Sequence, residues 1–219
     1  DLNIAKGHHV QYWEVGNEIN GSWEESWTHN PYEYMNGDDS HDGANEYCEQ
    51  MKAVDPDILV GFVGTRTADL YSGAPVGDPA VPASHTPALW SPIAIDGVDY
   101  YGWMPIVIHE ASDCFDFVSV HHYPFGEEAV DPVDVNDING SWHEAELLVT
   151  SSWEGIFRQV KEMVEDRGFQ VAITEYNGFH SMTQRQSVRV VNMLYLGESL
   201  GHIIEYGAMY ANQWDLENG

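Results

Sequence analysis

The chain has 219 residues, of which 43% are hydrophobic, and its eight Trp, twelve Tyr and seven Phe supply bulky packing groups. This is enough for one sizeable core, and it excludes a disordered or fibrous protein. No apolar stretch approaches the roughly 18 residues that span a bilayer, and no initiator Met or signal peptide opens the chain, so we expect a soluble chain that is cut at its N-terminus.

The charge balance is strongly acidic. Thirty-six Asp and Glu residues against eight Lys and Arg give a formal net charge of −28. Electrostatic repulsion therefore disfavours nucleic acid or an anionic membrane surface as a partner. Self-repulsion also destabilises the compact state unless salt screens it, so we expect a halophilic protein that requires salt.

Apolar runs alternate with amphipathic patterns along the chain. The apolar runs predict strands, each buried on both faces, at residues 10–15, 58–63, 117–121, 171–174 and 207–211. The amphipathic patterns predict helices at residues 45–54, 153–165 and 184–204. This alternation is typical of parallel strands joined by right-handed crossovers, which is an α/β fold.

Two predicted connections, residues 64–114 and 123–150, are long and follow a strand. An α/β barrel places its site-forming loops there. Five strands do not close a barrel, which needs eight, so a barrel would lack its beginning. Neither a repeat nor a linker divides the sequence, and residues 1–219 are therefore predicted to form a single domain.

Two of the apolar runs lead into a glutamate. Gly16-Asn17-Glu18 follows the first run, and Glu175-Tyr176-Asn177 follows the fourth. A carboxylate at the end of a buried strand has a fixed position, and two that face one cleft are what cleavage of a glycosidic bond requires. Taken singly, each glutamate is more often an ordinary exposed residue.

The segments around these glutamates resemble those of the large clan of retaining glycoside hydrolases (clan A) built on (β/α)8 barrels. Trp-Glu-Val-Gly-Asn-Glu at residues 13–18 resembles the fourth-strand motif, and Ile-Thr-Glu-Tyr-Asn at 173–177 resembles the seventh. Residues 51–58 resemble the passage to the fifth strand, 117–123 the sixth with its His-x-Tyr, and 210–214 the eighth. The resemblance implies the C-terminal part, strands 4 to 8, of a (β/α)8 TIM barrel that is the catalytic domain.

The resemblance also assigns roles. It implies that Glu18 is the general acid/base and Glu175 the nucleophile of a double displacement, and that Tyr123 holds Glu175 by a hydrogen bond. The implied substrate-binding residues are Asn17, His121, Tyr123, Gln213 and Trp214. The expected partner is a carbohydrate, and neither a metal nor another cofactor is expected.

Within the clan, the sequence is most similar to the α-L-arabinofuranosidase (family 51-like) branch. It departs from that branch at the nucleophile, where Thr-Glu-Tyr-Asn stands in place of the usual Asp-Glu-Trp. The expected substrate is a plant-type polysaccharide or its oligosaccharides, and its size favours an extracellular location. The alternatives are an endoglucanase, a β-xylosidase, or a truncated or non-catalytic carbohydrate-binding fragment, whose exposed strand edges would favour a homo-oligomer.

Other motifs have weaker interpretations. Residues 38–49 fit the spacing of a calcium loop, but no helix is predicted before them, and a solvated loop that caps the next helix is favoured. Cys48 and Cys114 lack the spacing of a zinc site and are interpreted as buried small hydrophobic residues. His122 is expected to pack outward while His121 joins the site. Glu14 is interpreted as structural and would need an interior partner. Aromatic residues of the loops, which fit sugar stacking and loop packing equally, are Trp23, Trp27, Tyr32, Tyr34, Trp90, Trp103 and Trp142.

Overall fold

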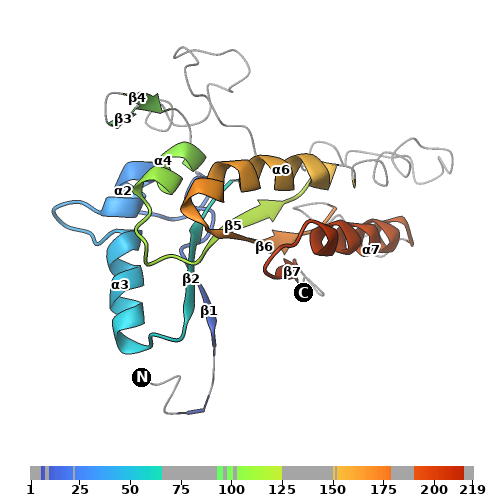
Figure 1. Cartoon of the computed structure of the whole chain (residues 1–219), viewed down its shortest axis with the longest axis horizontal. Helices are drawn as coiled ribbons and strands as arrows, with labels where there is room; N and C mark the ends of the chain where they lie inside the picture. Colours follow the sequence, from blue (N-terminus) through green and yellow to red (C-terminus); the bar gives the residue numbers. More distant parts are fainter. Residues whose placement is uncertain are drawn as a thin grey trace. The chain divides into compact units, whose positions relative to one another are not determined.

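The computed structural model describes residues 6–7, 10–21, 23–65, 93–95, 98–100, 103–124, 150, 152–178 and 190–214. Within them, five strands form one sheet in the order β1-β2-β5-β6-β7 (Figure 1). Their bounds are β1 (Tyr12–Val15), β2 (Leu59–Val63), β5 (Phe117–His122), β6 (Gln170–Tyr176) and β7 (Ala211–Gln213). The pairs β1–β2, β2–β5 and β6–β7 are parallel, as predicted.

The helices separate these strands along the chain. They are α2 (Pro31–Asn36), α3 (Ala44–Val54), α4 (Trp103–Glu110), α6 (Ser152–Val164) with a 3-10 turn at Glu165–Arg167, and α7 (Val190–Glu205). A separate antiparallel hairpin joins β3 (Ile93–Ile95) to β4 (Val98–Tyr100). No helix in the described part of the chain is long and apolar enough to cross a membrane.

The chain divides into two compact units. The first holds Asp1–Ser119 and Glu162–Gln170, and the second holds Val120–Lys161 and Val171–Gly219. The division passes through β5 and β6. That residues 1–219 form a single domain stays a prediction.

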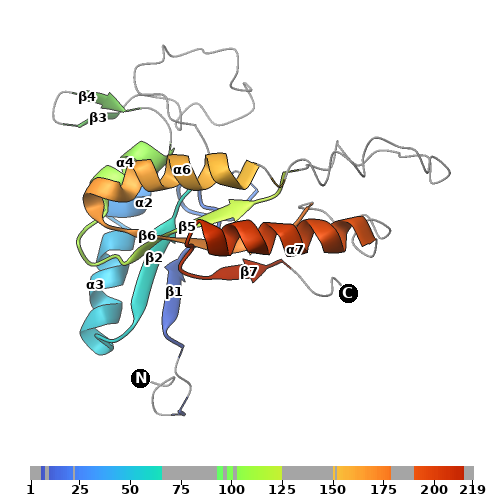
Figure 2. The ribbon, with the colours of Figure 1, turned by 45° about the vertical axis from the view of Figure 1, so that its right-hand side comes forward.

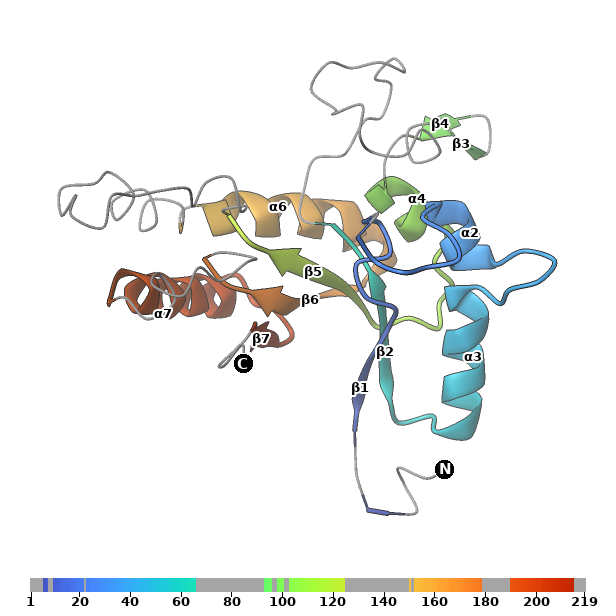
Figure 3. The ribbon, with the colours of Figure 1, turned by 180° about the vertical axis from the view of Figure 1, so that it is seen from behind.

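In the first unit, aromatic rings fill the space around β2. Phe62 is fully buried and meets the rings of Phe115 and Phe169 edge to face, with centroids 5.2 and 5.3 Å apart. Gly61 allows this packing, because a Cβ there would lie 2.1 Å from the ring of Phe117. Figure 3 shows α3 beside β2, and α2 packs against both α3 and α4.

In the second unit, the core lies between α6, β6 and α7. Trp153 is fully buried and meets Tyr176 edge to face at 6.0 Å. Phe157, Ile173 and Tyr195 are also almost fully buried. Figure 2 shows α7 alongside β7, which is the last strand of the order.

The structure corrects four expectations about secondary structure. β1 is not buried on both faces, because it lies at the edge of the sheet and leaves Tyr12 44% and Trp13 37% exposed. The last strand begins at Ala211, four residues later than its predicted start at 207. The predicted connection 64–114 contains α4 and the hairpin, and α2 precedes the 38–49 loop. Most of the remaining residues of both long connections, including Trp90 and Trp142, lie outside the described residues.

The interpretation of the cysteines is also wrong. Cys48 on α3 and Cys114 after α4 form a disulfide, with Cα atoms 6.1 Å apart. Nearby, Lys52 forms an ion pair with Asp116 (2.7 Å) and donates a hydrogen bond to the Cys114 carbonyl. Two cysteines 66 residues apart carry no sequence signal of pairing, since only the packing of α3 against the segment after α4 brings them together.

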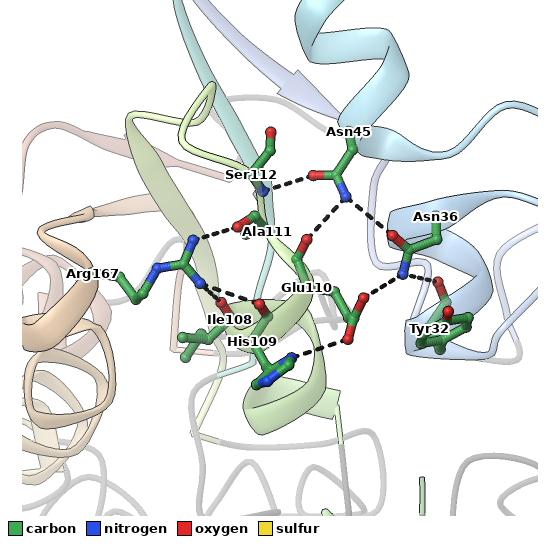
Figure 4. A network of polar contacts seen from close by, with 9 residues as sticks. All are labelled: Tyr32, Asn36, Asn45, Ile108, His109, Glu110, Ala111, Ser112 and Arg167. Carbon is green, nitrogen blue, oxygen red and sulfur yellow. Dashed lines mark hydrogen bonds and ion pairs between the residues drawn. The ribbon is translucent and has the colours of Figure 1, made fainter. Parts of the chain in front are cut away.

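A polar network holds the end of α4 in the first unit (Figure 4). Arg167 donates hydrogen bonds to the carbonyls of Ile108 (2.6 Å), His109 (3.2 Å) and Ala111, so its cation lies at the negative end of the helix dipole. From the other side, Asn45 accepts the Ser112 N–H and donates to the Glu110 carbonyl. The side chain of Asn45 therefore connects the start of α3 to the end of α4.

Candidate active site

Glu175 lies near the C-terminal end of β6, in the second unit. Its side chain is 18% exposed, and its Oε2 accepts a hydrogen bond of 2.7 Å from the hydroxyl of Tyr123. Nδ1 of His121 lies 3.4 Å from the same oxygen. The hydrogen bond expected between Tyr123 and Glu175 is therefore present, and the carboxylate has a defined orientation.

The alternation of side chains along β5 explains why His121 reaches this carboxylate. His122 is buried, its Nε2 lies 3.1 Å from the hydroxyl of Ser152, and its ring meets that of Trp153 edge to face at 4.5 Å. Adjacent residues on a strand point to opposite faces, so packing His122 against α6 turns His121 to the other face. The prediction that His122 packs is confirmed.

The end of β7 lies next to the same segment of β6. Gln213 pairs in register with Tyr176, and the Trp214 N–H donates to the Tyr176 carbonyl at 3.1 Å. Asn177 is fully buried and donates from Nδ2 to the Trp214 carbonyl at 2.6 Å. Five of the predicted site residues thus belong to the second unit: His121, Tyr123, Glu175, Gln213 and Trp214.

Glu18 and Asn17 belong to the first unit and lie in a tight turn after β1. Gly16 has φ +93, and a Cβ there would lie 2.8 Å from the side chain of Ile19. Glu18 has φ 42 and is the only non-glycine residue with a positive φ in the described part of the chain. A left-handed non-glycine residue costs about 1–3 kcal/mol, and such residues concentrate at functional sites.

The side chains of this turn bond to residues a few positions further along. Oε2 of Glu18 accepts a hydrogen bond of 2.5 Å from the indole Nε1–H of Trp23. Nδ2 of Asn17 donates to Oε1 of Glu24 at 3.1 Å. The turn itself is closed by a hydrogen bond of 2.7 Å from the Gly21 N–H to the Glu18 carbonyl.

Tyr34 fixes the strand end that leads into the turn. Its hydroxyl donates to the Val15 carbonyl (2.6 Å) and accepts the Val63 N–H (3.0 Å), which joins the ends of β1 and β2. Burial raises the pKa of the Tyr34 phenol well above its ordinary value, against the opposing effect of the Val63 N–H. Trp103 also holds the end of β2, because its Nε1–H donates to the Val63 carbonyl at 2.7 Å. Both aromatic residues are therefore structural.

Glu14 has the interior partner that its position requires. Oε1 of Glu14 accepts a hydrogen bond from the hydroxyl of Ser119, which is buried on β5. The two side chains lie on strands that both pair with β2. The structural interpretation of Glu14 agrees with this contact.

The 38–49 loop differs from its interpretation as a helix cap. Helix α3 begins at Ala44 after Gly43, which supplies no side-chain cap. Within the loop, Oδ1 of Asp38 accepts the Ser40 N–H at 2.7 Å and lies 3.0 Å from Nδ1 of His41. These contacts lower the pKa of Asp38, and the hydrogen bond from the Ser40 N–H has the larger effect, followed by that from His41. The ring of His41 in turn stacks on Trp27 with centroids 4.4 Å apart.

A cleft of about 720 Å³ lies between β1 and α3, and the carboxylate of Glu18 does not line it. Its lining is mostly apolar and includes Trp13, Trp27, Tyr47, Met51 and Val54. Glu18 and Asn17 are not part of the lining. The cleft therefore belongs to the edge of the sheet rather than to the turn that carries the predicted acid.

Sequence reasoning missed two contacts that shape the site. The bond from Trp23 to Glu18 needs a chain reversal between them, for which Gly21 is the signal. The buried Asn177 follows the predicted nucleophile by two residues, and its part in holding the Trp214 backbone depends on the pairing of β6 with β7. No short-range pattern reports such a pairing.

Comparison with known proteins identifies the fold. No protein-family model matches the sequence, and no curated protein matches it either. Among solved structures, an α-L-arabinofuranosidase from Thermotoga maritima in complex with arabinose is similar, with a TM-score of 0.55 and 20% identity over 95% of this chain and 34% of that chain. A thermostable family 51 α-L-arabinofuranosidase from Thermotoga petrophila gives a TM-score of 0.58 and 19% identity, over 98% of this chain and 37% of that chain.

A family 51 α-L-arabinofuranosidase from Bifidobacterium longum gives a TM-score of 0.61 and 15% identity, over 97% of this chain and 40% of that chain. The chain thus spans between a third and two fifths of the length of these three structures. The likeness confirms the expected fold class, an α/β fold that corresponds to part of a (β/α)8 barrel.

Proposed function

We propose that this chain carries the catalytic residues of a retaining glycoside hydrolase that acts on a plant-type polysaccharide or its oligosaccharides, with arabinofuranosidase as the leading activity. The observation that supports this best is the setting of Glu175. Its carboxylate is largely enclosed at a strand end, and one oxygen meets both the Tyr123 hydroxyl and the His121 ring. A nucleophilic carboxylate needs this fixed orientation.

The proposed reaction is a double displacement. A carboxylate oxygen of Glu175 attacks the anomeric carbon, the glycosidic C–O bond breaks, and Glu18 gives its proton to the leaving oxygen. Glu18 then takes a proton from water, the water oxygen attacks the anomeric carbon, and the bond to Glu175 breaks. The sugar leaves with its original anomeric configuration, because two inversions have taken place.

The other proposed site residues bind the sugar. The exposed Gln213 and Trp214 at the end of β7 offer an amide and an indole face, and Asn17 lies beside Glu18. Indole faces pack against the apolar faces of sugar rings, and amides hydrogen-bond sugar hydroxyls. The similarity in fold to family 51 arabinofuranosidases favours an arabinofuranoside over the xyloside and glucoside alternatives.

The disulfide supports a location outside the cytosol, because disulfides persist in oxidising compartments. We therefore propose an extracellular protein, in keeping with a polymeric substrate. The proposed partner is a carbohydrate.

The test is an assay on aryl α-L-arabinofuranoside, β-xyloside and β-glucoside in molar NaCl. It is applied to the 219-residue chain and to the same chain within a longer polypeptide that completes the barrel. We expect turnover of the arabinofuranoside by the completed barrel, its abolition by Glu175→Ala, and a loss of about 10²–10⁴-fold with Glu18→Ala. Turnover that survives Glu175→Ala would contradict the proposed nucleophile. Binding of oligosaccharides without turnover would favour the non-catalytic alternative.

A further inference from the structure

We propose that Trp23 is a positioning residue for Glu18, and that its indole N–H fixes which carboxyl oxygen carries the proton during the reaction. This inference rests on the proposed function, in which Glu18 is the acid/base. Its structural basis is the 2.5 Å hydrogen bond from Nε1 of Trp23 to Oε2 of Glu18, both in the first unit.

The chain between the two residues is shaped for this contact. The Gly21 N–H bonds to the Glu18 carbonyl and reverses the chain. The indole of Trp23 then lies over Gly21 so closely that a Cβ at residue 21 would be 2.2 Å from the ring. Only a residue without a side chain allows the ring to fold back at this position.

The exposure of Trp23 shows that the contact does not result from core packing. The residue is 62% exposed, so burial of apolar area does not account for the position of its ring. Most of the indole faces solvent while its one polar atom points to the carboxylate. The hydrogen bond and the reversal at Gly21 therefore hold the ring in place.

The contact has a direct consequence for proton transfer. Indole nitrogen is a donor only, so Oε2 must accept. The carbonyl oxygen of a neutral carboxyl is a better acceptor than its hydroxyl oxygen, so the indole favours the proton on Oε1. When Glu18 gives up this proton, negative charge develops on the carboxylate, and a hydrogen bond to a charged group is stronger than one to a neutral group. The bond thus strengthens in the transition state, which is where an interaction raises the rate.

The first test needs no enzymatic activity. In ¹H–¹⁵N spectra of the 219-residue chain, Trp23→Phe removes one indole cross-peak and so assigns it. We expect this peak to move as pH is lowered through the carboxyl range, about pH 4, and to stay in place in Glu18→Gln. A peak that does not move with pH, or that moves equally in Glu18→Gln, overturns the proposal whether or not the chain is a glycosidase.

The second test is kinetic and uses the completed barrel with aryl glycosides of graded leaving-group pKa. Trp23→Phe keeps the ring and removes the donor. We expect kcat/KM to fall about tenfold to a hundredfold for poor leaving groups, which need a proton, and little for good ones, which do not. The basic limb of the pH profile should also move to higher pH, since the donor favours ionised Glu18.

Two further variants separate positioning from general damage. Gly21→Ala should reproduce the kinetic effect of Trp23→Phe, because the added methyl group displaces the exposed indole at little cost in stability. Trp27→Phe removes another partly exposed indole, whose ring stacks on His41, and should leave the leaving-group dependence unchanged. Equal losses for good and poor leaving groups in Trp23→Phe overturn the positioning role.

Discussion

Removing the disulfide between Cys48 and Cys114 is expected to lower the free energy of unfolding by about 4 kcal/mol. The bridge joins residues that are 66 positions apart. A cross-link that closes a loop of this length removes about 15 cal/mol/K of chain entropy from the unfolded state, which is about 4 kcal/mol at 25 °C. That loss is a large fraction of the 5–15 kcal/mol by which domains are ordinarily stable.

The variants Cys48→Ala, Cys114→Ala and the double variant test this value. Each single variant already breaks the bridge, so all three should lose nearly the same free energy, with a small extra loss where the buried Cys48 side chain leaves a gap. The assay is urea unfolding in molar NaCl with and without a reducing agent, followed by far-UV circular dichroism. Reduction should shift the midpoint of the wild type alone. Single losses that add up in the double variant, or a wild type that is insensitive to reduction, would refute the reasoning.

Three further predictions concern stability. Arg167→Met should lower the free energy of unfolding by about 2–3 kcal/mol, because the charged hydrogen bonds from Arg167 to the end of α4 are lost. Arg158→Met, at an exposed position, should lower it by less than about 1 kcal/mol. Thermal unfolding of the two variants measures both losses, and equal losses would contradict the role of Arg167. Stability should fall above about pH 10, where an unfolded tyrosine loses its proton but Tyr34 keeps it, by up to 1.4 kcal/mol per pH unit. Tyr34→Phe should flatten this alkaline decline in pH-dependent urea unfolding, and an unchanged slope would contradict the buried phenol as its cause. The melting temperature should rise from low to molar NaCl if self-repulsion of the −28 charge limits stability, and a constant value would reject that expectation.

The strands that sequence predicts best are those in the middle of the sheet. β2, β5 and β6 are apolar because both of their faces are buried, and this leaves a continuous run in the sequence. The strands at the edges of the sheet are harder to predict from the sequence. β7 has three residues, and its predicted start at Gly207 lies in the turn that follows α7, which ends at Glu205.

Helices α4 and α2 were not predicted from the sequence, for two different physical reasons. α4 is buried at Trp103, Met104, Ile106 and Val107, so it lacks the polar face on which a periodic pattern depends. α2 has only six residues, fewer than two turns. Its signals are local, namely Asn30 as N-cap and Pro31 at the first helical position.

In the candidate site, too, some features could be predicted from the sequence and others could not. The positions of Glu18 and Glu175 follow from strand ends, and the contact of Tyr123 with Glu175 is what the resemblance of His-x-Tyr to the sixth-strand motif implied. Trp23 and the disulfide could not be predicted in the same way, because each depends on a chain reversal or a packing of helices that no apolar pattern encodes.

The most direct test of the proposed nucleophile is covalent trapping. The completed barrel is incubated in molar NaCl with an activated 2-deoxy-2-fluoro-α-L-arabinofuranoside, and the modified peptide is sequenced by mass spectrometry. A retaining mechanism forms a glycosyl-enzyme intermediate on a carboxylate, so we predict one sugar attached to Glu175 and no labelling of Glu175→Gln. Labelling of another carboxylate, or turnover that inverts the anomeric configuration without a covalent intermediate, would contradict it.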